Sequence, residues 1–183
     1  ARCFGCLSFI IILATNASAQ FHVCELRALS RTGGQSGTEF DLDVIAGDRL
    51  NDVSGLVFSN PGITAAQKTT AALPFSEEAV GLSGKFHVRV AAEVQPGRYE
   101  VRASGRHGLS NPRVFVVTTA VNELVTAVSH DPQTPTELPL EQFVNAACTA
   151  AQRDWFRFEL QEPADLAIEF IAQRVDSRMI GQL

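Results

Sequence analysis

The stretch QPGRYEVRASGRHGLSNPRVFVV, residues 95–117, is the clearest guide to the fold. Tyr99, Val101 and Ala103 alternate with charged or polar residues in its first half. Alternation with a period of two is typical of a strand that has one buried and one solvated face. Pro-Gly and Asn-Pro pairs precede the two halves and are turn signals. The stretch therefore predicts two antiparallel strands, at 97–104 and 113–118.

The same alternation recurs in the residues before this stretch. The runs 40–44 and 86–90 each place an apolar residue at every second position, with charged residues between. Gly-, Pro- and Asn-containing turns separate these runs. Short strands broken at this spacing favour an all-β antiparallel sandwich. The strands are expected near residues 22–28, 38–46, 55–59, 63–70, 85–91, 97–104 and 113–118.

Residues 32–58, TGGQSGTEFDLDVIAGDRLNDVSGLVF, resemble the start of the immunoglobulin-like domain of the IPT/TIG type. The stretch 95–117 is similar to the last two strands of that fold, and its Pro-Gly-x-Tyr99 sequence is similar to a tyrosine corner, in which the phenol bonds back to the backbone. The resemblance covers about residues 22–118 and implies an Ig-like antiparallel β-sandwich, with a domain at 20–118. PKD and fibronectin type III modules share the Gly-x-Tyr-x-Val sequence and remain alternatives.

The chain changes character after residue 118. Residues 119–140 contain three prolines and no sustained periodicity, which predicts a linker or edge segment. Strands are expected again at 143–147, 155–160 and 166–171. The unit 141–183 would then have about three strands, too few to bury a sandwich core. We therefore expect it to be cut off at its C-terminal side.

The stretch RDWFRFEL, residues 153–160, is the densest group of rings and charges in this second half. With a period of two, Phe156, Phe158 and Leu160 share one face, which we expect to be buried at about 1.5–3 kcal/mol for each residue. Phe158→Asp is then expected to unfold this unit alone. Trp155 and Arg157 lie on the opposite face, and we predict them as surface-contact residues.

RDWFRFEL and the turn after it resemble the Asp-aromatic-Phe-x-Phe strand of bacterial pre-peptidase C-terminal (PPC) domains. These domains are β-sandwiches with jelly-roll character, so the resemblance implies an incomplete, jelly-roll-like second sandwich at 141–183. The acidic Glu-Pro-Asn-Asp start usual in that family is Ser-His-Asp-Pro at 129–132 here. An Ig-like module followed by a PPC module is similar to the arrangement in large secreted bacterial proteins.

The first 19 residues have the features of a secretory signal peptide, expected as a helix. An uncharged apolar run, too short to span a bilayer, precedes the small-x-small cleavage sequence Ala17-Ser18-Ala19. We therefore expect a secreted or cell-envelope protein with no membrane span in the mature chain. Cys24 and Cys148 lie one in each half of that chain. In an oxidising compartment they would form a disulfide, or else remain as two buried thiols.

Charge and motif content exclude several classes of function. The formal net charge of −5, with 15 basic against 20 acidic residues, argues against a nucleic-acid partner. The four histidines have neither zinc-ligand nor catalytic spacing, so we predict no catalytic residue, cofactor or metal ligand. A solvated acidic face is favoured over a calcium site, because the chain lacks the dense Asp-x-Asp-x-Asp-Gly loop. The aspartates considered for that site are Asp41, Asp43, Asp48 and Asp52.

These observations favour a noncatalytic, extracytoplasmic β-sandwich region. It would act as a spacer, adhesion or presentation module of a larger secreted or envelope protein, with a protein or polysaccharide of the cell surface as its partner. The alternative is the N-terminal accessory region of a secreted hydrolase, such as a peptidase, with its catalytic domain beyond residue 183. A third hypothesis is a calcium-dependent glycan binder.

Overall fold

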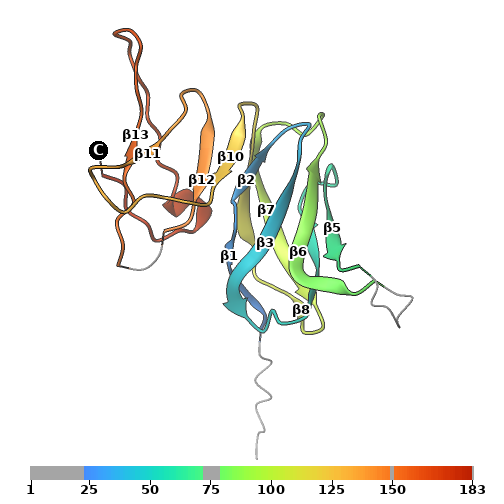
Figure 1. Cartoon of the computed structure of the whole chain (residues 1–183). Coiled ribbons are helices and arrows are strands. Elements are labelled where there is room, and N and C mark those ends of the chain that lie inside the picture. The colour runs from blue at the N-terminus through green and yellow to red at the C-terminus, as the bar shows by residue number, and fades with distance from the viewer. Residues whose placement is uncertain (1–22, 72–78, 149–150, 183) are drawn as a thin grey trace, which may run out of the picture.

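The computed structural model describes residues 23–71, 79–148 and 151–182 (Figure 1). The predicted signal peptide, residues 1–19, lies outside these ranges. The described chain consists of β-strands, loops and one 3₁₀ turn, which confirms the predicted all-β class. It forms a two-sheet sandwich that is followed by a C-terminal segment lying against one side of it.

Two mainly antiparallel sheets form the sandwich. One has the strand order β1-β3-β6-β5, and the other has the order β2-β9-β7-β4 with β8 beside β7. When β1 and β2 are counted as one split strand and the short β8 is left out, seven strands remain. Their order then matches the immunoglobulin arrangement, in which the first, second, fifth and fourth strands form one sheet and the remaining strands the other. The Ig-like sandwich is thus confirmed. The bounds are β1 Glu25–Leu29, β2 Gly33–Gln35, β3 Glu39–Asp48, β4 Val53–Phe58, β5 Ile63–Thr69, β6 Gly81–Val90, β7 Gly97–Gly105, β8 Gly108–Leu109 and β9 Arg113–Thr118.

The core lies between the sheets and follows the alternation in the sequence. In β6 every second residue from Gly84 to Val90 is buried, and the residues between them are exposed. Phe115 of β9 is fully buried, stacks on Phe40 at 6.2 Å between ring centroids and meets the edge of Phe58 at 5.2 Å. Aromatic pairs at such distances stabilise a core beyond their buried area. This ring cluster joins the two sheets.

Strand β2 is a strand of the sandwich that the alternation did not predict. Gly33 and Gly34 have the composition of a turn, yet they run parallel to β9, opposite Val116 and Val117. A Cβ on Gly33 would lie 2.5 Å from the carbonyl oxygen of Val116, and one on Gly34 would lie 2.3 Å from the Phe40 ring. Glycine is therefore needed here for close approach, and glycine leaves no apolar signal in the sequence.

The predicted tyrosine corner is present. Tyr99 donates its hydroxyl proton to the carbonyl oxygen of Gln95, with an oxygen–oxygen distance of 2.8 Å. We expect Tyr99→Phe to lower the free energy of unfolding by about 1 kcal/mol, because one side-chain hydrogen bond is lost while the ring remains. Urea denaturation of the two proteins would show this as a lower midpoint at an unchanged slope. An unchanged midpoint would mean that the hydroxyl has no structural role.

The C-terminal segment contains two short parallel pairs and a 3₁₀ turn. Strand β10 (Asn122–Val125) pairs with β12 (Phe143–Ala146), and β11 (Thr136–Glu137) pairs with β13 (Phe156–Arg157). The turn η1 covers Gln173–Val175. Two of these strands, β10 and β11, lie within residues 119–140, where we expected a linker or edge segment. That stretch therefore supplies edge strands to its C-terminal neighbours.

The expectation of a buried aromatic face in this segment was wrong. Phe156, Phe158 and Leu160 are 37–41% exposed, the strand expected at 155–160 is reduced to β13, and no strand forms at 166–171. The reason is that each parallel pair among the described residues has only two strands, which is too few to bury an apolar face. Phe158→Asp is consequently not expected to unfold this segment.

Candidate interaction surface

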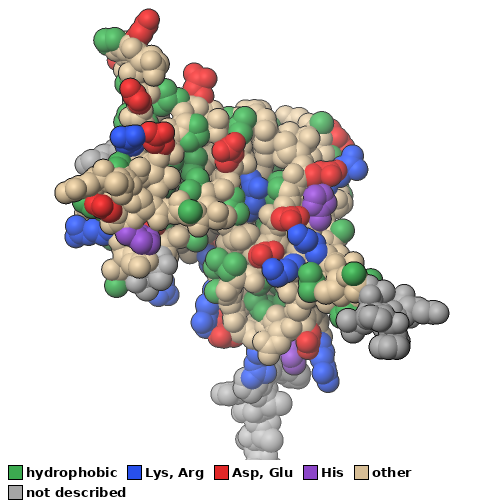
Figure 2. Space-filling view, in the orientation of Figure 1, with side chains coloured by type: hydrophobic (Ala, Val, Ile, Leu, Met, Phe, Trp, Pro, Cys, Tyr) green, Lys and Arg blue, Asp and Glu red, His purple; other side chains and the backbone are tan. Residues whose placement is uncertain are grey.

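The outer face of the first sheet carries ion pairs, and acidic, basic and histidine side chains lie side by side there in the space-filling view (Figure 2). Asp41 accepts a hydrogen bond from Lys68 and lies 3.1 Å from His87 Nδ1. Glu39 lies 3.3 Å from the other His87 ring nitrogen, and Asp43 lies 3.7 Å from Lys85. These side chains are between 39% and 56% exposed, so this is the solvated charged face that the sequence predicts. Over residues 23–71, 79–148 and 151–182, no group of three or more His, Cys, Asp or Glu side chains is placed to hold a metal ion.

The position of His87 leads to a pH-dependent prediction. Hydrogen bonds to Asp41 and then Glu39 raise the pKa of His87 above its usual value of about 6.5. The stabilisation from charged His87 is fully present below the unfolded-state pKa, and it is lost as the pH rises through the higher folded-state pKa. An NMR titration should give a His87 midpoint above 6.5, and Glu39→Gln with Asp41→Asn should lower that midpoint. Equal midpoints in the two proteins would contradict the assignment.

A second polar cluster lies at the start of RDWFRFEL. His130 Nδ1 lies 2.8 Å from Asp154. Burial, and then a hydrogen bond to Asp154, raise the pKa of the Cys148 thiol. A raised pKa favours the protonated thiol, which is the opposite of what a nucleophilic cysteine requires. Cys24 is a buried thiol, and it is not joined to Cys148 by a disulfide.

A buried arginine connects the sandwich to the C-terminal segment. Arg31 is 7% exposed, and its guanidinium lies 4.0 Å from the centroid of the Phe40 ring. Arg31 donates to the backbone oxygen of Asn122 at 2.5 Å, to the side-chain oxygen of Asn122 at 2.9 Å and to the carbonyl oxygen of Gly33 at 2.9 Å. Burial lowers the pKa of Arg31 from its usual value.

Asn145 of β12 completes this connection. Its side-chain nitrogen donates to the side-chain oxygen of Asn122 at 2.6 Å, and its side-chain oxygen accepts from the backbone nitrogen of Thr32 at 3.1 Å. We call Arg31, Asn122 and Asn145 the clasp. Each member bonds to another member or to the backbone beside it, so β10 and β12 are attached to the start of β2 through satisfied polar groups.

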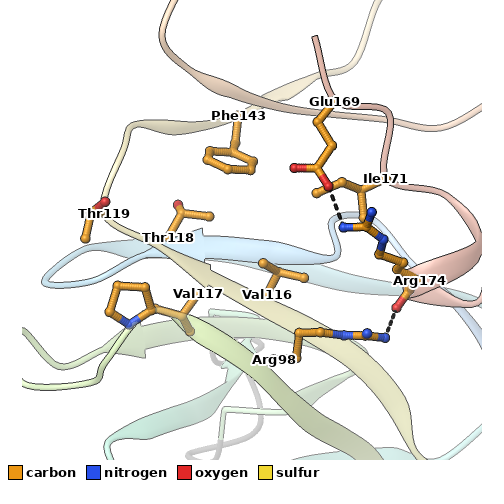
Figure 3. A pocket seen from close by; sticks show the side chains of 10 residues that line it. Arg98, Val116, Val117, Thr118, Thr119, Phe143, Glu169, Ile171 and Arg174 are labelled. Atoms are coloured by element: carbon orange, nitrogen blue, oxygen red, sulfur yellow. Dashed lines mark hydrogen bonds and ion pairs between the residues drawn. The ribbon is translucent and has the colours of Figure 1, made fainter. Parts of the chain in front are cut away.

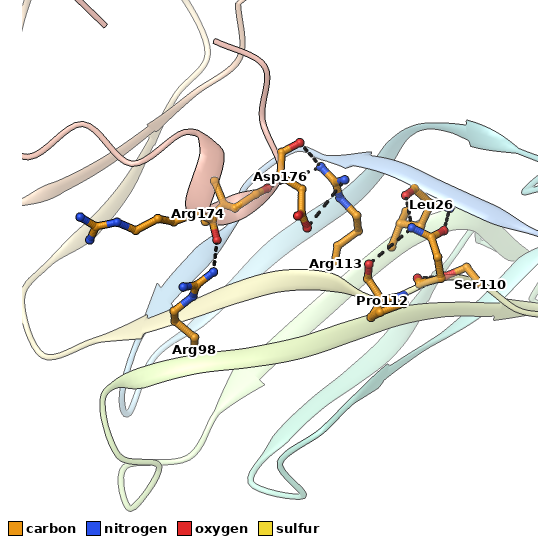
Figure 4. A network of polar contacts seen from close by, with 9 residues as sticks. Leu26, Arg98, Ser110, Pro112, Arg113, Arg174 and Asp176 are labelled. Carbon is orange, nitrogen blue, oxygen red and sulfur yellow. Dashed lines mark hydrogen bonds and ion pairs between the residues drawn. The ribbon is translucent and has the colours of Figure 1, made fainter. Parts of the chain in front are cut away.

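The turn η1 forms a second attachment (Figure 4). Arg98 of β7 donates to the carbonyl oxygen of Arg174. Arg113 of β9 donates to the carbonyl oxygen of Asp176 at 2.9 Å and lies 3.7 Å from its carboxylate. Ala172 and Val175 are buried here, and they are the two buried apolar residues of the segment after residue 118 among those described.

A groove of about 280 Å³ lies beside the second attachment, between the sandwich and the C-terminal segment (Figure 3). Phe143 and Ile171 line it on the segment's side, and Val116 lines it on the sandwich's side. Its charged groups are engaged, because Glu169 pairs with Arg174. The volume is slightly below the range of typical ligand pockets. The groove is therefore a crevice of the joint between the two parts.

Of the predicted contact residues, Arg157 lies on β13 and Trp155 directly precedes it, at the base of a projection. Trp155 is 39% exposed, and its backbone is fixed by bonds to Ser129 and Thr136. Arg157 forms an ion pair with Glu137. Both are at the surface as expected, while the contact with a partner stays a prediction.

The projection is formed by residues 158–170, which we call the arm (Figure 1). The chain extends outward, bends at Gln161–Glu162 and returns to η1. All of its residues are exposed, including the large apolar ones. These are Phe158, Leu160, Leu166, Ile168 and Phe170, at 37–56% exposure. We expected some of these side chains in a core, and their exposure is the feature that the sequence pattern did not reveal.

Comparison with known proteins gives one weak similarity. No protein-family model and no curated protein matches the sequence. A solved structure of the Bacteroides ovatus mixed-linkage glucan utilization locus protein SGBP-B, in complex with a mixed-linkage heptasaccharide, is 18% identical with a TM-score of 0.30. The match covers 54% of this chain and 22% of that one. In the described part of the chain, no helix has the length and apolarity needed to cross a membrane.

Proposed function

We propose that this chain is a noncatalytic, extracytoplasmic presentation module of a larger secreted or cell-envelope protein. In this function the Ig-like sandwich holds the C-terminal segment in a fixed position and thereby displays the arm to a partner. The observation that carries the proposal is the clasp, in which the buried Arg31 of the sandwich bonds to Asn122 across 91 residues of sequence. A spacer between mobile units would not require a buried cation at its joint.

The energetics of the joint support a fixed position. Burying a guanidinium is costly unless its donors find acceptors, and Arg31 is surrounded by carbonyl and amide oxygens and an aromatic face. Moving the segment away would break these bonds and expose Ala172 and Val175 of the second attachment. The two attachments hold the segment at both of its ends.

The proposal also assigns each part of the chain to a domain family. We propose that the sandwich is an IPT/TIG-type module and that residues 141–183 are the first part of a PPC-like domain. The signal-peptide pattern of residues 1–19 supports export from the cytoplasm. A cell-surface protein or polysaccharide is the proposed partner, and the accessory role beside a secreted hydrolase stays the alternative.

The anisotropy decay of Trp155 tests the fixed position, because Trp155 is the single tryptophan of the chain. In the native protein we expect the decay to follow the tumbling of the whole molecule. Replacing Arg31 by Met and Asn145 by Ala removes the clasp but keeps an apolar stem on Phe40. This variant should add a faster decay component.

The matched control is Arg89→Met, which removes an arginine that is 69% exposed on the outer face of β6. It should leave the decay unchanged. A fast component already present in the native protein would show that the sandwich does not hold the segment, and the presentation role would then be wrong.

A further inference from the structure

We propose that the arm, residues 158–170, is a docking surface for an extended, cationic β-strand of a partner protein, in which apolar residues alternate with Lys or Arg. This inference rests on the proposed display of the arm, since it names the partner that the arm would take. It stands against the PPC-like assignment of residues 141–183, under which later strands of the same domain would cover the arm. Three properties of the arm carry it: its apolar pattern, its backbone and its charge.

The apolar residues of the arm have the spacing of strand residues. Phe158 and Leu160 are two positions apart on the outgoing leg, and Leu166, Ile168 and Phe170 are two positions apart on the returning leg. Alternate residues of an extended chain point to the same side. Each leg therefore presents a row of apolar side chains, and such exposed rows mark interaction surfaces in soluble proteins.

The backbone of the arm is available for pairing. At its base, Trp155 and Arg157 use their carbonyl oxygens to accept bonds from Thr136 and Leu138. Beyond Arg157, residues 158–170 make no backbone hydrogen bond to other described residues. Extended chain with unpaired N–H and C=O groups pairs readily with an added strand, which supplies main-chain hydrogen bonds and leaves specificity to alternate side chains.

The charge of the arm specifies what the added strand carries. Glu159, Glu162, Asp165 and Glu169 are its charged residues, and it contains no Lys or Arg. Glu169 pairs with Arg174, so the acidic side chains of the outer arm are left to face a partner. Cross-strand pairs of opposite charge stabilise a sheet and like charges destabilise it. A strand with Lys or Arg between its apolar residues is therefore complementary.

A second copy of this chain is a poorer occupant. Two arms placed side by side would bring four acidic residues against four, and the like charges would oppose pairing at every register. The apolar rows alone would suit either occupant, so charge decides between them.

Titration of the chain from residue 20 onward with synthetic strands tests the inference. The probe is the peptide KVKVKVKV, and the matched peptide is EVEVEVEV. We expect the lysine peptide to change Trp155 fluorescence and to slow hydrogen exchange in residues 158–170. Its affinity should fall roughly tenfold between low and 0.5 M salt, because the charges are exposed and screened. The glutamate peptide should change neither the Trp155 fluorescence nor the hydrogen exchange of residues 158–170.

Two matched variants separate charge at the arm from overall charge. Glu162→Lys with Asp165→Lys should weaken binding of the lysine peptide roughly tenfold. Glu93→Lys with Asp52→Lys makes the same change at exposed positions outside the arm and should leave it unchanged. Leu166→Ser with Ile168→Ser should weaken binding of the lysine peptide without altering its salt dependence.

Other occupants would give different results. Concentration-dependent self-association that protects the arm would identify a second copy, and slow exchange in the monomer without peptide would mean that the chain's own residues cover it. Either result, or equal binding of the two peptides, overturns the inference. Failure of the proposed function is seen separately in the Trp155 decay without peptide, which none of the arm variants should change.

Discussion

Phe115→Ala is expected to lower the free energy of unfolding of the sandwich by about 3–5 kcal/mol. Phe115 is fully buried between the sheets and contacts the rings of Phe40 and Phe58. Its removal leaves a cavity in the place where the two sheets meet, and the paired strands around it limit how far the cavity can close. Urea denaturation followed by circular dichroism measures the loss.

Phe158→Ala is the matched control, because it removes the same side chain from the arm, where Phe158 is 41% exposed. Its effect should stay within about 0.5 kcal/mol. If the two substitutions were equally destabilising, Phe158 would lie in a core, and both the exposed arm and its display would be contradicted.

Arg31→Ala is expected to destabilise the protein by about 2 kcal/mol, the size expected for lost hydrogen bonds from a charged donor. The substitution removes charge-assisted bonds to Asn122 and Gly33 and the contact with Phe40, which together exceed the relief from no longer burying a cation. Hydrogen exchange should accelerate most in residues 122–125 and 143–146, which are tied to the sandwich through the clasp.

Arg27→Ala is the control for this effect. Arg27 pairs with Glu25 and Asp48 on the surface, and such exposed pairs contribute little to stability, so Arg27→Ala should leave the exchange of residues 122–125 and 143–146 unchanged. Accelerated exchange spread evenly over both parts in Arg31→Ala would show that Arg31 stabilises the sandwich itself and not the joint.

The sandwich was predictable because its strands bury every second residue against a complete opposing sheet. Leu42, Phe86 and Val101 are fully buried at positions that the alternation indicates. The Tyr99 corner could also be predicted, since its bond to Gln95 is local. Strand β2 could not be predicted, because Gly33 lies so close to β9 that only glycine fits there, and glycine has no side chain to signal burial.

The same alternation led to the wrong prediction that Phe158 and Leu160 are buried. Alternation shows which residues share a face, but burial also requires a second surface, and the described residues after 118 form only two-stranded pairs. The clasp was equally invisible, since Arg31 and Asn122 are 91 residues apart and neither lies in a motif. Trp155 was expected at the surface because its position in the period is opposite to that of Phe156, but Phe156 is nearly as exposed, so the period did not separate the two.

Residual dipolar couplings measure most directly whether the sandwich holds the C-terminal segment in place. Backbone couplings from residues 25–71 and 79–118 define one alignment tensor, and those from 122–125 and 143–146 define another. If the sandwich holds the segment, the two tensors should coincide in magnitude and orientation. A markedly smaller tensor for the second group would mean that the segment moves independently, and the displayed arm would have no fixed position.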